Sequence, residues 1–173
     1  MPIQNVLMNA GTWLKVGDNY LSHYGDSYMG LGYDGYWRPL IKFNNDGFSG
    51  QILSASLKVY CSSTAWPWVT GFKVNKAFNP VTAAWATPWT TAGCNAVNED
   101  RSGVELFTGT QLTAVGWNTI PVADLSELLG VINGLDSIIL TGSGAGATYI
   151  EKSNPPYLAI EYKTSIVGGV QIF

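Results

Sequence analysis

The residues best suited to chemistry in this sequence are one histidine and four nearby aspartates. His23 lies among Asp18, Asp26 and Asp34, and Asp46 follows. A Ser-His-Asp hydrolase needs a nucleophile held beside its histidine, and no Gly-x-Ser-x-Gly motif occurs. Glycoside hydrolysis needs two opposed carboxylates, but each aspartate adjoins glycine or asparagine, which is typical of turns. We therefore predict a structural or solvent-exposed His23, turn-forming aspartates and no enzymatic activity.

The sequence contains none of the common metal-binding or cofactor-binding motifs that we considered. The sequence has no His-Glu-x-x-His, no Cys-x-x-Cys and no phosphate-binding loop. Asn44, Asn45, Asp46 and the Gly25-Asp26 pair carry oxygens of the kind that calcium binds, but a turn explains the same residues. We predict no cofactor and no metal site, with a structural calcium ion as the alternative.

We predict that the two cysteines are buried free thiols. Cys61 ends an alternating apolar run, and Cys94 lies in a polar stretch that contains glycine. A disulfide between them stays open as an alternative, because the sequence does not place their Cα atoms within bridging distance.

Aromatic side chains are the main candidates for a binding site. Sugar-binding sites lay aromatic faces against sugar rings beside a few polar groups. Proline in Trp66-Pro67-Trp68 indicates a loop or strand edge, where indoles are exposed. Other aromatics could simply fill the core. The candidate glycan-binding residues are Tyr24, Tyr28, Tyr33, Tyr36, Trp66 and Trp68, with Trp37 and Trp89 as further aromatic candidates.

The segment 24–39, YGDSYMGLGYDGYWRP, combines tyrosines with glycines. Alternation puts Gly30 and Gly32 on one face, but the large side chains do not all share the other face. We expect part of the segment to be a core strand and part to be a glycine-rich bend that exposes tyrosines.

Short alternating runs separated by turn residues predict an all-β chain. Regular short strands of this kind favour a sandwich or a barrel. The expected strands cover residues 12–16, 39–43, 52–60, 70–75, 118–122, 137–140 and 157–162.

One helix is expected over about 124–133. Asp124 is placed to cap its first turn, with Glu127 completing a capping box, and Gly134 is placed for a left-handed C-terminal residue. Apolar residues recur there at helical spacing, at Leu125, Leu128, Leu129 and Ile132.

Composition supports the β prediction and excludes some partners. Charged residues make up 12% of the 173 residues, aromatics make up 13%, and there are 20 glycines, whereas an average domain is roughly 25% charged. The net charge is −3, and the nine basic residues are scattered along the sequence. Binding to nucleic acid or to an anionic membrane needs clustered Lys and Arg, so we expect neither partner.

Several segments together resemble the DNRLRE family. NYLSHYGDSYMGLGY, RPLIKFNNDGF and ILSASLKVY are similar to the opening of that family. FKVNKAFNPVTAAWATPW, GWNTIPVADLSELLGVING and PPYLAIEY are similar to its later segments. The likeness runs from about 19 to 162, although the usual Ser-Arg-Glu near the family's end is IEKSNPP here.

The resemblance implies a fold and a class of function. It implies a jelly-roll-like antiparallel β-sandwich with one short helix, and core positions for Phe43, Trp85 and Trp117. Family members are usually non-catalytic modules of secreted or surface proteins. Some bind carbohydrates, including acidic polysaccharides such as alginate. We accordingly expect one sandwich domain over 1–162, followed by a tail or extra strand over 163–173.

The tail is apolar and free of charge after Thr164. An exposed strand of this kind is sticky, so it either folds back on its own domain or docks on a neighbouring subunit as an arm. The candidate assembly residues are Ile166, Val170, Ile172 and Phe173.

Two functions remain open at the level of sequence. The first is a non-catalytic structural or adhesive subunit of an extracellular or viral assembly, above all a bacteriophage virion decoration or tail protein. The alternative is a carbohydrate-binding module of a secreted polysaccharide-active protein. Because residues 1–5 lack a basic region and no long apolar stretch follows them, we predict no signal peptide in this chain. We expect a virion or extracellular-surface location, with a homo-oligomer, another virion or surface protein, or a cell-surface glycan as partner.

Overall fold

A computed structural model describes residues 1–44, 48, 50–135 and 137–163 of the chain. Asn45 and Asp46, for which a turn is predicted, lie outside this part, as does the apolar tail. The structure therefore does not address the proposed assembly residues Ile166, Val170, Ile172 and Phe173.

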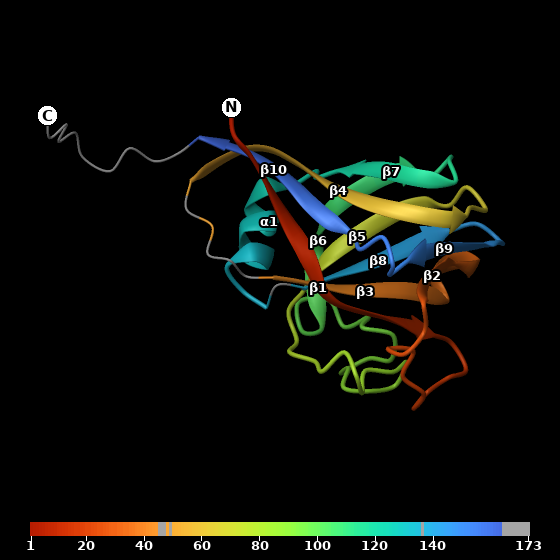
Figure 1. Cartoon of the computed structure of the whole chain (residues 1–173). Coiled ribbons are helices and arrows are strands. Elements are labelled where there is room, and N and C mark those ends of the chain that lie inside the picture. The colour runs from red at the N-terminus through yellow and green to blue at the C-terminus, as the bar shows by residue number, and fades with distance from the viewer. Residues whose placement is uncertain (45–47, 49, 136, 164–173) are drawn as a thin grey trace, which may run out of the picture.

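The described residues form strands, one α-helix and a short 3-10 turn (Figure 1). Along the chain these are β1 (Ile3–Lys15), β2 (Tyr28–Gly32), η1 (Tyr33–Gly35), β3 (Trp37–Phe43), β4 (Gln51–Ser63), β5 (Trp68–Val74), β6 (Arg101–Gln111), β7 (Gly116–Pro121), α1 (Leu125–Ile132), β8 (Ser137–Ser143), β9 (Ala147–Glu151) and β10 (Tyr157–Lys163).

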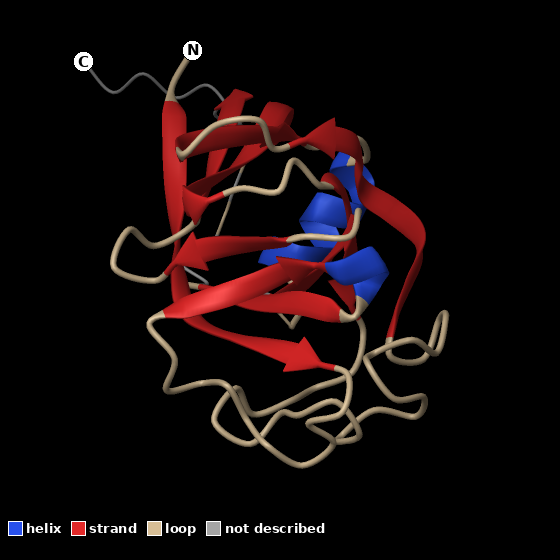
Figure 2. Ribbon diagram, turned by 90° about the vertical axis from the view of Figure 1, so that its right-hand side faces the viewer, coloured by secondary structure: helices blue, strands red, loops and turns tan. Residues whose placement is uncertain are grey.

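Six strands close into a barrel. Figure 2 shows the molecule turned by 90°, with the strands in red and the helices in blue. The antiparallel ring runs β1–β10–β4–β9–β2–β3 and returns to β1. Strands β8, β5 and β6 extend the sheet from β3, and β7 adds to β4. The predicted all-β chain with one α-helix is confirmed, but the strands do not clearly form a jelly-roll sandwich.

The barrel closes because two long strands change partners along their length. Strand β1 pairs with β10 up to Leu7 and with β3 from Met8 onward, with an irregularity before Ala10. Strand β4 pairs with β10 in its first part and meets β9 at Cys61 and Ser63, across a second irregularity. Bulges of this kind bend strands, so one strand can serve two parts of a barrel.

Two apolar clusters lie on opposite faces of the extended sheet. The larger fills the barrel and includes Leu31, Ile41, Phe43 and Phe107. The smaller lies where the segment 75–100 covers the outer face of β3, β5 and β8 (Figure 1), and its buried members are Leu14, Leu40, Val74, Ala83, Trp89, Cys94 and Ile139. Both cysteines are buried and free, as expected, and burial raises the pKa of each thiol to about 12.

The helix forms where it was predicted, with different end contacts. The Asp124 carboxylate accepts the backbone N–H groups of Ser126 and Glu127. The Glu127 side chain pairs with Lys73 at 3.4 Å, so it does not complete a capping box. Gly134 is not left-handed; a Cβ there would collide with the Gly130 carbonyl oxygen, which explains the glycine by close approach.

Aromatic burial departs from the family-based expectation at one position. Phe43 lies in the barrel core, and the half-buried Trp85 packs against the smaller cluster. Trp117 is 49% exposed, because it projects from the outer side of β7 and meets Tyr60 and Tyr157 by their ring edges. The prediction of a core Trp117 is therefore wrong.

Candidate ligand-binding cleft

A cleft of about 400 Å³ opens on the outer face of β5 and β8, beyond the part that the segment 75–100 covers. Strands, the η1 turn and the covering segment all contribute to its walls. The lining residues are Asp34, Gly35, Arg38, Trp68, Thr70, Phe72, Asn95, Arg101, Thr141, Gly142 and Ser143.

Strand register places the floor of the cleft. Trp68 lies opposite Ser143, and Thr70 lies opposite Thr141, in the β5–β8 pair. Directly paired residues share a face of a sheet, and the face alternates along each strand. The same alternation sends Val69 into the barrel core. The floor thus presents an indole beside hydroxyl groups.

Arg38 is held firmly at one wall. Its Nη1 donates to the Gly93 carbonyl oxygen at 2.8 Å and to Oδ1 of Asn95, and its Nε donates to the Gly35 carbonyl oxygen. Burial lowers the pKa of Arg38, and the nearby charge of Arg101 lowers it further. Both positively charged side chains thus belong to the lining of one cleft.

Arg101 also lines the cleft. Its guanidinium carbon lies 3.9 Å from the ring centre of Phe72, and Nη1 donates to the Ser102 carbonyl oxygen at 3.2 Å. Its Nε is buried without a hydrogen-bond partner. Neither Arg38 nor Arg101 forms an ion pair with an acidic residue in the described part of the chain. These are the only two arginines in the sequence.

Asp34 forms the rim with its backbone in the left-handed region, at φ 52°. Its carboxylate accepts the Gly144 N–H at 2.8 Å, and its own N–H donates to the Gly144 carbonyl oxygen at 3.2 Å. The predicted turn role of Asp34 is therefore observed. This reciprocal pair fixes η1 against the β8–β9 connection.

The predicted aromatic residues are divided by the structure. Trp68 is 54% exposed and lines the cleft, and Trp66 is 63% exposed just before it. Tyr33 and Tyr36 are exposed in and beside η1, whose Asp34 and Gly35 line the cleft.

The remaining aromatic candidates lie elsewhere. Tyr28 and Trp37 are half-buried in an aromatic cluster with Trp13. Tyr24 is exposed beside Lys152, and Trp89 is buried in the smaller core cluster. The segment 24–39 thus divides into a strand and an exposed bend, as expected.

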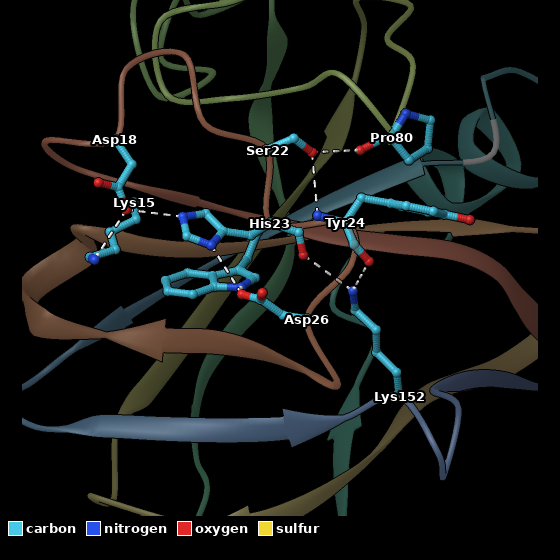
Figure 3. Close-up of polar contacts among 9 residues, drawn as sticks. Lys15, Asp18, Ser22, His23, Tyr24, Asp26, Pro80 and Lys152 are labelled. Atoms are coloured by element: carbon cyan, nitrogen blue, oxygen red, sulfur yellow. Dashed lines mark hydrogen bonds and ion pairs between the residues drawn. The ribbon is translucent and has the colours of Figure 1, made fainter.

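His23 lies in a second polar cluster that does not line the cleft (Figure 3). His23 is 8% exposed, and its ring packs on that of Trp13 with 4.1 Å between centroids. Its Nε2 lies 3.0 Å from Oδ2 of Asp18, and its Nδ1 lies 3.0 Å from Oδ2 of Asp26. A hydrogen bond from Lys15 does most to lower the pKa of Asp18; burial opposes it and the His23 bond adds to it.

This cluster attaches the segment 16–27 to the rest of the molecule. The Trp13 indole N–H donates to the same Asp26 oxygen at 2.9 Å. Lys152 donates to the Tyr24 carbonyl oxygen at 2.7 Å, and the Ser22 hydroxyl donates to the Pro80 carbonyl oxygen at 3.3 Å (Figure 3). Asp18 and Asp26 therefore order this loop through His23 and do more than form turns.

No protein-family model and no curated protein matches this sequence. Within the described ranges, no helix is long and apolar enough to cross a membrane. The same residues contain no group of three or more His, Cys, Asp or Glu side chains placed to hold a metal ion.

Proposed function

We propose that this chain is a non-catalytic carbohydrate-binding module whose cleft takes an acidic sugar chain. The observation that carries the proposal is the convergence of both arginines of the chain on one cleft, beside an exposed tryptophan. Of the two functions considered from the sequence, this geometry favours the carbohydrate-binding module.

The cleft has the composition of a sugar site. Trp68 offers an aromatic face, and Thr70, Thr141 and Ser143 offer hydroxyl groups beside it. Sugar rings present apolar C–H faces and many hydroxyl groups, so an aromatic surface with a few oriented polar groups matches them.

The arginines add a preference for negative charge. A guanidinium is always charged and presents a planar fork of donors that matches a carboxylate or sulfate group. Neither guanidinium group has an acidic ion-pair partner in the described structure, so an anion bound in the cleft would be attracted by both charges. The chain as a whole carries a net charge of −3, so this attraction is local to the cleft.

The number of carboxylates in the cleft supports binding without hydrolysis. Asp34 is the only carboxylate among the described residues that line it, and that group accepts the Gly144 N–H. Most glycoside hydrolases act with a pair of carboxylic residues across the scissile bond.

We also propose that the barrel is a bent variant of the DNRLRE-type jelly roll, on the strength of the resemblance. The first function considered from the sequence, a virion decoration or tail subunit, stays a prediction. Its assembly residues lie outside the described chain, and the two roles are compatible if the cleft mediates adhesion.

Binding to a polysaccharide panel tests the proposal. We expect the wild-type chain to retain a polyuronate and a sulfated glycan in affinity electrophoresis, and to release them as salt rises, because salt screens exposed charges. Arg101→Gln should weaken binding about tenfold, which corresponds to about 1.4 kcal/mol. Lys163→Gln, an exposed charge outside the cleft, should not.

Two outcomes would contradict this function. Retention of neutral glycans alone would exclude charge recognition, and equal binding by the Arg101→Gln and wild-type chains would exclude the cleft. Thermal melting of each variant establishes that the fold is intact.

A further inference from the structure

The turn between β4 and β5, residues 64–67, holds an exposed tryptophan in a strained conformation. Trp66 has φ 57° and is 63% exposed. A bulky side chain with positive φ is a conformational outlier that persists only when its surroundings enforce it.

Hydrogen bonds from three directions enforce this conformation. The Thr64 hydroxyl donates to the Leu112 carbonyl oxygen at 2.9 Å and accepts the Trp66 N–H at 3.0 Å. The Gln111 side-chain amide donates to the Trp66 carbonyl oxygen at 3.2 Å. The Thr148 hydroxyl accepts the Ala65 N–H at 3.0 Å. The turn is therefore a rigid support for an indole in solvent.

The same turn lies next to elements that reach the cleft. A Cβ at Gly146 would collide with that of Ala65, so the turn lies directly against the β8–β9 connection. The Gly146 carbonyl oxygen accepts the Tyr33 N–H at 3.3 Å, which joins that connection to η1. Trp66 itself does not line the cleft, although Trp68 does.

Non-glycine residues with positive φ occur in both η1 and the turn 64–67. The non-glycine residues with positive φ in the described chain are Tyr33, Asp34, Trp66, Cys94 and Asn98. Tyr33 and Asp34 lie in η1, and Trp66 lies in the turn 64–67. Cys94 precedes Asn95, which lines the cleft. Strained residues of this kind gather at ligand-binding sites, where the fold maintains a fixed arrangement.

We propose that Trp66 is an outlying platform that stacks on a sugar beyond the one in the cleft. The site then recognises an internal run of a linear polysaccharide and not a single terminal sugar. Trp66 and Trp68 are two residues apart, so their Cα atoms are at most about 7 Å apart and both indoles can serve one chain. This inference rests on the proposed carbohydrate-binding function and adds the length of the ligand.

A length series of oligosaccharides tests it. Titration calorimetry with the disaccharide and the hexasaccharide of the retained acidic polymer is compared for wild type, Trp66→Ala, Trp68→Ala and Trp117→Ala. We expect Trp66→Ala to weaken hexasaccharide binding about three- to tenfold and to leave disaccharide binding unchanged. Trp68→Ala should weaken both. Trp117→Ala, which removes an exposed indole on β7, should weaken neither.

The variant Thr64→Val tests whether the hydrogen-bonded turn 64–67 matters for binding, because it leaves the Trp66 indole in place. It removes both hydrogen bonds of that hydroxyl at nearly constant shape, and it should weaken hexasaccharide binding alone, by less than Trp66→Ala does. An unchanged hexasaccharide affinity in Thr64→Val would exclude a role for the strained turn. Melting curves check that each variant is folded.

The outcomes separate the two claims. If Trp66→Ala binds every length as wild type does while Trp68→Ala is impaired, the outlying platform is wrong and the cleft stands. The same holds if Trp66→Ala weakens both lengths equally, because Trp66 would then belong to the cleft. If all variants bind both oligosaccharides with wild-type affinity, or wild type binds no acidic oligosaccharide, the cleft is not the binding site. The proposed role of Trp66 is then wrong as well.

Discussion

At the scale of residues, one buried carboxylate organises the segment that walls the cleft. Asp100 is fully buried and accepts the backbone N–H groups of Thr90, Thr91 and Ala96 at 2.8, 3.0 and 3.1 Å. Burial raises the pKa of Asp100, but these hydrogen bonds outweigh burial and leave the pKa below its ordinary value of 3.8. The segment that supplies Asn95 to the cleft is thus folded around an acidic side chain.

We expect Asp100→Asn to lower the free energy of unfolding by about 2–3 kcal/mol. The amide loses the charge that strengthens three hydrogen bonds and turns an NH₂ group toward a backbone N–H. Urea denaturation monitored by tryptophan fluorescence measures the change. Glu99→Gln alters an exposed neighbour and should have no effect; a similar loss in both variants would contradict this account.

Acid should destabilise the fold through the same group. The pKa values of Asp18 and Asp100 are lower in the folded chain than the ordinary 3.8. A depressed acid stabilises the fold fully above its unfolded pKa and loses that contribution as pH falls through its folded pKa. The urea midpoint should therefore decline as the pH drops below about 4, and it should decline less in Asp100→Asn. A midpoint that stays constant from pH 7 to pH 3 would be inconsistent with these contacts.

At the scale of elements, strands with a clear apolar pattern were predicted from the sequence, and strands with a weak pattern were missed. Strand β4 is read directly from the residues 52–60, and α1 from its leucine spacing and Asp124. Strand β6 escaped prediction because Gly103 and Gly109 interrupt its alternation, and the short β9 carries little pattern. The N-terminal half of β1 was missed because its exposed positions include apolar Ile3 and Leu7.

A glycine in β5 is required by packing and not by its backbone angles. A Cβ on Gly71 would lie 2.5 Å from Cδ2 of Phe107 and 2.8 Å from Cδ2 of Leu140. We expect Gly71→Ala to destabilise the protein by about 1–3 kcal/mol, as overpacking does. Chemical denaturation measures it. Gly25→Ala is the control, since no atom lies within 4 Å of a Cβ there, and comparable effects of the two would refute the packing argument.

At the scale of the whole molecule, closure of the barrel and assembly of the cleft were beyond sequence reasoning. Closure depends on β1 and β4, each of which pairs with different strands along its length. The local alternation of apolar residues does not encode such a change. Exposure of Trp66 and Trp68 was predicted correctly from proline chemistry. Arg38 and Arg101 were missed, because each looks ordinary in its own segment and only the fold brings them to one cleft.

An NMR titration shows whether this cleft is the binding site. Backbone and indole ¹H–¹⁵N signals are assigned and followed as an acidic hexasaccharide is added. We predict shift changes concentrated at Asp34, Trp68 and Ser143, extending to the Trp66 indole, with little change around Tyr24 or Trp117. Saturable binding with shifts centred on Tyr24 or Trp117, and none at Trp68, would contradict the account.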